Sequence, residues 1–382
     1  MLHEDRSKAP VAFLFLGETL LIPHLFPIVE ALVQLDPTLP IDLWVGDPAT
    51  YTLLAGRLGE MRGGARIRQT PGFAPMPARK LAVLARLWPR LWNARAIICA
   101  EQTSLWIPTL LPFGWRFIKT SHGVGSMSAR DDRRRRSAWR LLVPSEMERD
   151  TYLRRGFPPE KIMVTGYVKS AFQRTSTKPL FANERPTLLY APHWQRHRSS
   201  WWNWGRAVIK MLAEQRDFNV ILAPHQRLVE HDPGVRAVLD AVAMLPHIHT
   251  DLDSFALVDG SYPAAADIYL GDTSSQVVEF LARPRPCVFL NSQQLDWRAT
   301  DDHGFWECGD VVETFERIES AISESASLHS KYRDIQERFA RQALGVCGPE
   351  APLRAARIIL EAIGCQPSQD TTRRPSSVVA QA

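Results

Sequence analysis

The chain has 382 residues, which is too long for one ordinary hydrophobic core and predicts two domains. Hydrophobic residues make up 45% of the chain and charged residues 23%, a balance typical of a globular protein in water. The formal net charge of +5 is too small to indicate a general nucleic-acid binder, so we expect no nucleic-acid partner, although a basic patch could still face phosphates or an anionic membrane.

Membrane spans, secretion signals and cysteine pairs indicate where in the cell a protein is located. The apolar runs, of which 11–16 is typical, fall far short of the roughly 20 residues that span a bilayer, so we expect no transmembrane helix. The first ten residues lack the pattern of a secretion signal. The five cysteines are widely spaced and contain no CxxC pair. These features indicate a cytoplasmic protein, and peripheral attachment to the inner face of the membrane stays open.

The first half of the chain alternates strand patterns with helix patterns. Short apolar runs predict strands at 11–16, 41–45, 96–100, 116–119, 141–143 and 161–167. An apolar-periodic helix is expected at 24–35, and Ser145 three residues before Glu148 forms a capping box for a helix that ends at Gly156. This order predicts a parallel α/β layer with the loop at Gly17 on its ligand-facing edge. The dinucleotide fingerprint G-x-G-x-x-G is absent.

A basic segment rich in Leu and Trp lies at 76–95. Its apolar residues recur at helical spacing among several arginines. A basic amphipathic helix of this kind can rest on an anionic membrane surface. A helix buried on one face, with its basic face in water, explains the pattern equally well.

The strand expected at 116–119 runs into a loop with a histidine between small residues. His122 follows Ser121 and precedes Gly123 and Gly125. The end of a parallel strand is where a catalytic base would lie, and the two glycines would let a substrate approach the backbone closely. A histidine that serves only as a structural hydrogen-bonding group is an equal alternative.

The second half opens a new set of strands, expected at 187–190, 219–222, near 248, 268–270 and 287–290. Three of them end in polar loops, which contain His193, His225 and the run 272–275. Ligands of open α/β sheets bind beyond the carboxyl ends of the strands, so we expect these loops to meet around a ligand. A helix is expected at 351–363, after Pro349.

The turn at 272–275 is the most informative of these loops. Thr273 stands three residues before Gln276, the spacing of a capping box, and Ser274 and Ser275 add two more hydroxyls. A helix start of this kind suits a phosphate, and Glu279 lies one helical turn further on, within reach of the hydroxyls of a bound ligand. The competing interpretation is a capped helix whose hydroxyls only satisfy backbone N–H groups.

Asp251 and Asp253 have the D-x-D form that some metal-dependent transferases use to hold a nucleotide diphosphate. Two acidic residues at this spacing are frequent, and the pair also precedes a helix that it could cap. We therefore expect no metal site and no cofactor.

Four segments in order resemble the CDP-glycerol glycerophosphotransferase family, which includes teichoic-acid primases and polymerases and their relatives in capsule assembly. The matching segments are Ser121-His122-Gly123, the stretch from 143 to 167, the loop 190–194, and 223–225 followed by 272–275 with Glu279. The resemblance covers about residues 117 to 295. It implies a GT-B architecture, with two Rossmann-like α/β domains facing each other across a cleft.

Composition and the order of elements divide the chain into a first domain at 1–168, a polar linker at 169–186, a second domain at 187–348, a terminal helix at 349–364 and a disordered tail at 365–382. The resemblance implies that the first domain is the acceptor side and the second binds the donor, and it implies a role for each motif. His122, as the base, and His225, against the donor phosphate, would be the catalytic residues. The donor side would comprise His193, Arg227, Asp272, Thr273, Ser274, Ser275 and Glu279, and the acceptor side Gly17, Ser121, Gly123 and Gly125.

Two departures from the family pattern concern the ligands. Family members usually follow the first His-Gly with Thr-Pro and a basic residue, where this chain has Val124, Gly125 and Ser126. His193 stands where the family often has threonine. Both changes fall in loops that would touch donor or acceptor, so they put the identity of each in doubt.

The expected function is a transferase that moves a polyol phosphate from a CDP-activated donor to a hydroxyl of a cell-envelope glycan or a lipid-linked acceptor. One alternative is a GT-B glycosyltransferase that uses a nucleotide-sugar donor. Another is a non-catalytic protein that binds a nucleotide or a glycan and organises an assembly complex.

Overall fold

The computed structural model describes residues 8–16, 19–59, 61, 63–74, 80–121, 123–124, 131–172, 179–299 and 301–365. The chain forms two compact units. One contains residues 1–120, 132–142 and 348–382, and the other contains residues 121–131 and 143–347. The domain bounds expected from the sequence remain predictions, and the tail from 366 onward lies outside the described residues.

The first sheet has seven strands in the order β3-β2-β1-β4-β5-β6-β7. The pairings from β3 through β6 are all parallel. The strands are β1 (Val11–Phe15), β2 (Ile41–Val45), β3 (Ala65–Gln69), β4 (Ala96–Cys99), β5 (Phe117–Thr120), β6 (Arg140–Val143) and β7 (Ile162–Val164). The α-helices along this part of the chain are α1 (Ile22–Leu35), α2 (Pro48–Leu58), α3 (Lys80–Leu91), α4 (Trp106–Leu110), α5 (Arg133–Ser137) and α6 (Glu146–Arg154).

The sequence predicted all of these strands except β3. In β3 the side chains of Arg66 and Arg68 alternate with smaller residues, so the segment lacks the apolar character by which strands are recognised. It forms because it lies at the edge of the sheet, where both guanidinium groups reach the buried carboxylate of Asp42 on β2. The capping box at Ser145 is confirmed, since its side chain accepts the N–H of Glu148 at the start of α6.

The second sheet has six parallel strands in the order β10-β9-β8-β11-β12-β13. They are β8 (Thr187–Ala191), β9 (Asn219–Leu222), β10 (Ile248–Thr250), β11 (Ile268–Gly271), β12 (Cys287–Leu290) and β13 (Asp310–Val312). Its α-helices are α7 (Arg206–Glu214), α8 (Leu228–His231), α9 (Gly234–Asp240), α10 (Ser261–Ala265), α11 (Ser275–Phe280) and α12 (Ile318–Leu344). The order 3-2-1-4-5-6 is that of the Rossmann fold, and it recurs in the first six strands of the first sheet.

Short 3₁₀ helices and one π-helix connect these elements. The 3₁₀ helices are η2 (Thr19–Leu21), η3 (Thr103–Leu105), η4 (Pro159–Lys161), η5 (Val168–Ala171), η6 (Arg196–Arg198), η8 (Phe255–Leu257), η9 (Trp297–Ala299), η10 (Asp301–Cys308) and η11 (Phe315–Arg317). The π-helix is η7 (Trp201–Gly205).

The second sheet has a separate hydrophobic core on each face. Leu188 and Tyr190 of β8 pack on one face, whereas Leu189 and Ala191 pack on the other. Successive side chains of a strand point to opposite faces, so a strand buried on both sides needs apolar residues throughout. This is why the central strands are continuous apolar runs.

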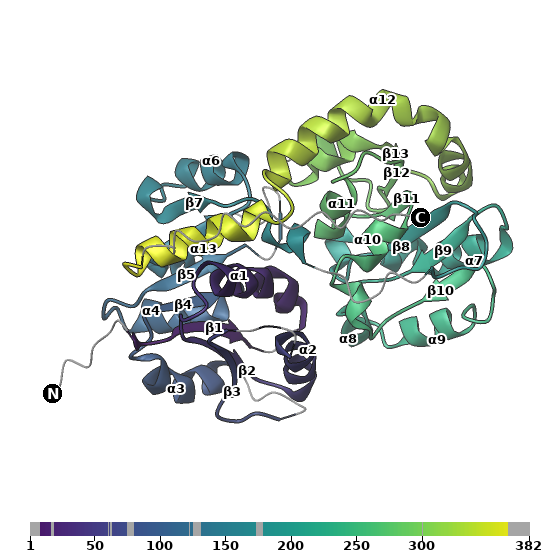
Figure 1. Cartoon of the computed structure of the whole chain (residues 1–382). Helices are drawn as coiled ribbons and strands as arrows, with labels where there is room; N and C mark the ends of the chain where they lie inside the picture. Colours follow the sequence, from purple (N-terminus) through teal and green to yellow (C-terminus); the bar gives the residue numbers. More distant parts are fainter. Residues whose placement is uncertain are drawn as a thin grey trace, which may run out of the picture. The chain divides into compact units, whose positions relative to one another are not determined.

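The last helix, α13 (Glu350–Ala362), belongs to the first unit, where it packs against α1 (Figure 1). The sequence predicted this helix and its start at Pro349, which is its N-cap. Among the described residues, no helix has both the length and the apolar character required to cross a bilayer.

The end of α12 depends on a glycine. Gly345 has φ of +62°, and a Cβ at this position would collide with the backbone carbonyl oxygen of Pro144. Gly348 also has a positive φ, +75°, but a Cβ there would meet nothing within 4 Å. The two glycines therefore separate backbone strain from steric collision.

We expect Gly345→Ala to lower the free energy of unfolding by about 2 kcal/mol more than Gly348→Ala. A positive φ costs about 1–2 kcal/mol for alanine at either position, and Gly345 adds the collision together with a ψ of −133°, which lies outside the left-handed helical region. Urea denaturation followed by circular dichroism measures both values. Equal losses would contradict the inferred contact with Pro144.

Candidate functional site

Three loops meet at the carboxyl edge of the second sheet. They follow β8, β9 and β11, which are neighbours in the sheet. The imidazole rings of His193 and His225 lie in edge contact, with their centroids 5.3 Å apart. The backbone N–H of His193 donates to the carboxylate of Asp272 at 3.0 Å. Residues far apart in the sequence thus share one small region at the point where the strand order reverses, which is where such sheets bind ligands.

Asp272 is the centre of this arrangement. Its carboxylate is buried, with 1% exposure, and accepts the N–H of His193 on one oxygen and the N–H of Ser200 at 2.9 Å on the other. Burial raises the pKa of Asp272 to about 6, although its hydrogen bonds oppose the shift. The residue therefore ties the loop after β8 to the loop after β11.

The hydrogen bonds of the two histidines fix their tautomers. The N–H of Gln195 donates to Nδ1 of His193 at 3.1 Å, and the N–H of Arg227 donates to Nδ1 of His225 at 3.2 Å. A ring nitrogen that accepts a hydrogen bond carries no proton, so the proton of each neutral ring lies on Nε2. Each imidazole therefore presents an Nε2–H donor.

His193 is also held in the neutral state. Burial lowers its pKa to about 3, and the charges of His225, Arg198 and His197 act in the same direction. At neutral pH this ring therefore donates a hydrogen bond without carrying a positive charge.

Trp194 extends the cluster into an aromatic stack. Its indole stacks on His231 at a centroid distance of 4.8 Å and on His193 at 5.7 Å. The guanidinium of Arg227 lies 5.7 Å from the indole centroid. Neither Trp194 nor His231 was expected at the site, and the aromatic residue next to His193 in the loop is the sequence signal that points to the stack.

The turn before α11 differs by one residue from the expected capping box. Ser274, not Thr273, is the N-cap, and its side chain accepts the N–H of Gln276 at 3.2 Å. Thr273 is buried and continues the strand exit, so the helix starts one residue later than the Thr273–Gln276 spacing predicted. The side chain of Ser275 lies outside the described part of the structure.

Glu279 has partners that the sequence did not indicate. Its Oε1 accepts from the hydroxyl of Tyr167 at 2.6 Å and from Nζ of Lys169 at 2.7 Å. The side chains of Lys169 and Glu279 are 9% and 11% exposed. All three residues line a cavity of about 260 Å³ together with Gly260 and others. A contact of Glu279 with donor hydroxyls remains a prediction.

The expected acceptor side is described only in part. Gly17, His122 and Gly125 lie outside the described residues. Ser121 donates its hydroxyl to Oε1 of the buried Glu148 at 2.7 Å. A Cβ on Gly123 would meet no atom of the described residues within 4 Å.

The two carboxylates of the D-x-D pair accept local hydrogen bonds and form a surface ion pair. Asp251 accepts from the hydroxyl of Tyr262 at 2.5 Å and from the N–H of Ser254 at 2.9 Å. Asp253 forms a two-pronged ion pair with Arg236 at 2.9 and 3.0 Å. In the described part of the chain, no three His, Cys, Asp or Glu side chains gather into a group that could hold a metal ion.

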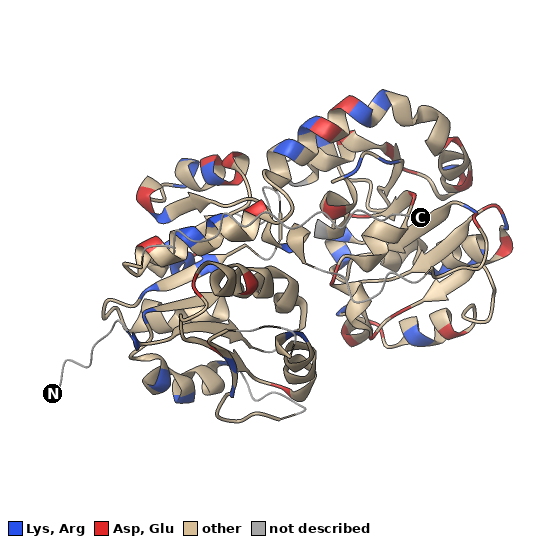
Figure 2. Cartoon of the chain, viewed as in Figure 1, with Lys and Arg blue, Asp and Glu red and all other residues tan. Residues whose placement is uncertain are grey.

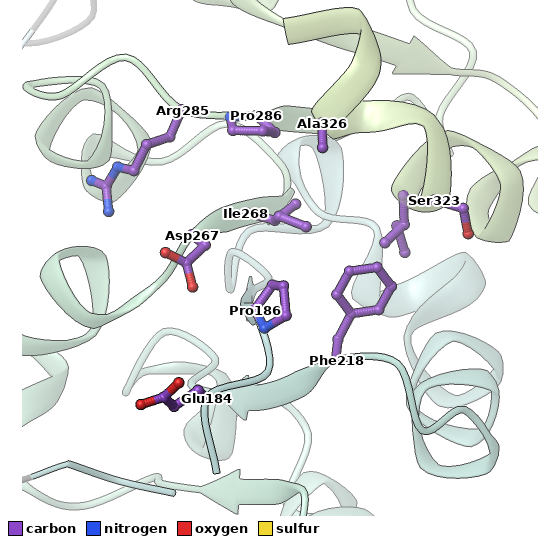
Figure 3. Close-up of a pocket in the computed structure, with 10 residues that line it drawn as sticks. Glu184, Pro186, Phe218, Asp267, Ile268, Arg285, Pro286, Ser323 and Ala326 are labelled. Atoms are coloured by element: carbon purple, nitrogen blue, oxygen red, sulfur yellow. The ribbon is translucent and has the colours of Figure 1, made fainter.

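A second crevice, of about 500 Å³, lies at the opposite edge of the same sheet (Figure 3). Pro186, Phe218, Asp267 and Pro286 line it, and each of them immediately precedes a strand. The crevice is therefore at the amino ends of the strands, away from the edge where parallel sheets bind ligands.

No protein-family model and no curated protein matches the chain. Solved structures do match it. The wall teichoic acid polymerase TagF, after a 30-minute soak with CDPG, is 14% identical with a TM-score of 0.67, over 95% of this chain and 91% of that chain. The UDP-GlcNAc 2-epimerase from Neisseria meningitidis, bound to UDP-GlcNAc, is 13% identical with a TM-score of 0.57, over 93% of this chain and 99% of that chain.

A third match is the S. aureus MnaA–UDP structure, 14% identical with a TM-score of 0.62, over 93% of this chain and 97% of that chain. At these identities the matches establish the fold and nothing finer. Together with the two parallel sheets, they show that the chain has the two-domain α/β architecture called GT-B, as expected from the sequence.

We expect Asp272→Asn to change the pH dependence of stability. Between pH 4 and 6 the folded wild type holds a proton on this carboxyl that the unfolded chain has released, so its stability falls as pH rises through this window. The fall contributed by Asp272 is about 3 kcal/mol. Asparagine does not titrate, so the variant lacks this contribution.

Urea denaturation at pH 4.5 and pH 7.5 measures the effect, with Asp334→Asn as an exposed control. Asparagine also offers one oxygen in place of two, so we expect a loss of about 1–3 kcal/mol from the N–H group left unpaired. The same pH dependence in wild type and Asp272→Asn would contradict the raised pKa.

Proposed function

We propose that this chain is a transferase that binds the diphosphate of a nucleotide-activated donor at the carboxyl edge of the second sheet. The donor would be a CDP-activated polyol, and a glycerol phosphate or similar group would pass to a hydroxyl of a cell-envelope glycan or lipid, releasing CMP. One observation carries the proposal. The imidazole rings of His193 and His225 are in contact, both accept a hydrogen bond at Nδ1, and the His193 loop is held by the carboxylate of Asp272.

The chemistry of the loops suits a phosphate. His193 offers a neutral N–H donor beside the ring of His225, Ser274 keeps a hydroxyl hydrogen while its oxygen caps α11, and Arg227 brings a permanent positive charge. Phosphoryl transfer needs positioning and charge neutralisation more than a covalent enzyme group. Donors fixed in a partly buried site supply both without reorganising during the reaction.

His122 completes the proposal as the general base. It would take the proton of the acceptor hydroxyl while the acceptor oxygen forms a bond to the phosphorus of the polyol phosphate. The bond from that phosphorus to the bridging oxygen of the diphosphate breaks, and CMP leaves with the electron pair. The hydrogen bond of the neighbouring Ser121 to Glu148 supports a fixed start for this loop.

The second candidate is a glycosyltransferase with a nucleotide-sugar donor. Two observations favour it: His193 stands where the resembled family often has threonine, and the Neisseria epimerase of the same fold is described as bound to UDP-GlcNAc. The same loops would hold the diphosphate, and the new bond would be glycosidic. A non-catalytic nucleotide-binding protein is the third candidate.

A thermal-shift panel separates these candidates by donor class. The panel contains CDP-glycerol, CDP-ribitol, CMP, CDP, UDP-sugars and CMP-linked acidic sugars, each with and without Mg²⁺. A donor at 100 times its Kd stabilises the fold by about 2.7 kcal/mol, and we expect this response from the CDP-polyols without metal.

A response confined to UDP-sugars or CMP-sugars would move the protein to the glycosyltransferases. Product analysis then identifies the bond made. Donor binding without turnover, unchanged by His122→Ala, would favour the non-catalytic candidate.

We expect His193→Gln to retain donor binding better than His193→Ala. The glutamine amide can place an N–H near the position of Nε2, whereas alanine removes the donor, so binding should weaken about tenfold or more only in the alanine variant. Isothermal titration with CDP compares the two variants. Equal affinities of both variants and wild type would remove His193 from the phosphate site.

A further inference from the structure

Lys169 falls where the sequence predicts a polar linker, but the structure buries it beside Glu279. Its Nζ lies 2.7 Å from Oε1 of Glu279, and the two side chains are 9% and 11% exposed. A lysine that belongs only to a linker keeps its ammonium group in water, because taking the charge out of water is costly. Lys169 therefore has a defined partner and a fixed place in the second unit.

One oxygen of Glu279 is fully used, and the other is available. Oε1 accepts from the hydroxyl of Tyr167 at 2.6 Å and from Nζ of Lys169. Oε2 accepts no hydrogen bond from the described residues, and a Cβ built on Gly260 would lie 3.8 Å from it. The ammonium group of Lys169 has three N–H groups, and Glu279 is its one acceptor in the described part of the chain.

These groups line the cavity of about 260 Å³, which thus has an acceptor and a donor side by side. The other charged residues of the lining, Asp259, Arg283 and Arg285, bond to backbone groups. A hydroxyl group both donates and accepts, so it can donate to Oε2 of Glu279 while it accepts from Nζ of Lys169. The ion pair carries no net charge, so the cavity suits a neutral, hydroxyl-bearing group.

The segment that carries Lys169 is fixed in place. The backbone N–H of Tyr167 donates to the carbonyl oxygen of Val346 at 2.7 Å. At the other end of the segment, the buried ring of Phe172 lies in edge contact with Phe255, with the centroids 5.9 Å apart. Lys169 therefore reaches Glu279 from a rigid support.

Glu279 lies on the helix that starts at the candidate phosphate site. Ser274, the N-cap of α11, precedes it by five residues. At 1.5 Å of rise per residue, the two positions are about 7.5 Å apart along the helix axis. The hydroxyls of a ribose or a polyol are a few bonds away from the phosphate that carries them, which is a comparable distance. A donor held at the carboxyl edge can therefore place a hydroxyl in this cavity.

We propose that Lys169 is a specificity-determining residue of the donor site. Paired with Glu279, it binds a hydroxyl group of the donor in the cavity, and Tyr167 is a positioning residue that orients the carboxylate. The hydroxyl belongs to the ribose or to the transferred polyol, which share this chemistry. This role rests on the proposed function, because it requires a nucleotide-activated donor at the neighbouring loops.

Isothermal titration with ligands that differ only in hydroxyl groups tests the role. CDP against 2′,3′-dideoxy-CDP measures the ribose hydroxyls, and CDP-glycerol against the propyl ester of CDP measures the glycerol hydroxyls. We expect the wild type to bind the hydroxyl-bearing member of one of these pairs about tenfold or more tightly, the effect of a hydrogen bond to a charged group. Lys169→Met and Glu279→Gln should each abolish this affinity ratio, whereas a purely structural ion pair would leave the ratio unchanged.

Further variants separate the effect of the hydroxyls from folding and from charge. Lys169→Met/Glu279→Gln removes both charges together, so it leaves no unpaired buried charge if a single variant fails to fold. Tyr167→Phe should lower the ratio about threefold, since one of the two donors to Oε1 is lost. His193→Ala should weaken all of these ligands alike and keep the ratio, because the diphosphate is common to them.

The charge control is Lys331→Met on α12. This exposed lysine lies on a helix that carries basic and acidic residues along its length (Figure 2). The variant removes the same charge as Lys169→Met and should keep the wild-type ratio. Circular dichroism melting shows that each variant is folded.

A ratio that persists in Lys169→Met/Glu279→Gln would overturn the assigned role, and so would a wild type that binds all of these ligands equally. An equal loss of the ratio in Lys331→Met would also overturn it, because the effect would then follow net charge. If no CDP compound binds the wild type, the proposed function fails and this role fails with it. Binding of CDP compounds with an unchanged ratio leaves the proposed function intact, so the two failures are distinguishable.

Discussion

The buried carboxylate of Asp272 is the interaction on which the candidate site depends. A loop that leaves a central strand has no ladder to hold it, and its backbone N–H groups need acceptors. Asp272 supplies two, for His193 and Ser200. Hydrogen bonds to a charged group contribute about 1.5–3 kcal/mol each, which offsets much of the desolvation that raises the pKa of this carboxyl. The result is a fixed β8 loop beside the β11 turn.

With these loops fixed, further backbone contacts set the chemistry of the imidazoles. The N–H groups of Gln195 and Arg227 each lie two residues beyond the ring that they bond, so both tautomers are determined by local turns. The stack on Trp194 then limits the rotation of His193. A buried neutral ring that donates from Nε2 costs less to keep in place than a buried imidazolium, since burial disfavours the charged form. The cluster thus presents directed N–H dipoles in place of a buried positive charge.

The two sheets share one strand order, but different kinds of side chain gather at their carboxyl and amino edges. In the second sheet the carboxyl edge gathers histidines, hydroxyls and a permanent cation, while the crevice at its amino edge is lined largely by apolar and backbone-bonded groups. In the first sheet the rings of Trp92 and Trp115, which precede the neighbouring strands β4 and β5, meet at the amino edge. Parallel strands make this separation possible, because every loop on one edge follows a strand and every loop on the other precedes one.

Some of these features follow directly from local sequence. Continuous apolar runs such as 187–191 specify strands buried on both faces, and a serine three residues before a glutamate specified the start of α6. The expected meeting of three polar loops followed from the parallel order alone. The edge strand β3 and the long helix α12 were not predicted from the sequence. The first has an alternating arginine pattern and the second is largely polar, so both are stabilised mainly by contacts with residues distant in the sequence.

The sequence by itself determined the alternation of strands and helices and which loops would carry polar side chains, since these depend on hydrophobic periodicity over short windows. The GT-B architecture was implied by the resemblance to a known family, not by periodicity. Only the tertiary structure decided which partners those side chains meet. The carboxylate of Asp272 accepts two backbone N–H groups, and Glu279 accepts from Tyr167 and Lys169, more than 100 residues earlier in the chain. Likewise, the rings of Trp92 and Trp115 meet because the strands that follow them pair. Hydrogen bonds and burial depend on distances in space, and these are fixed by packing between segments that sequence spacing does not relate.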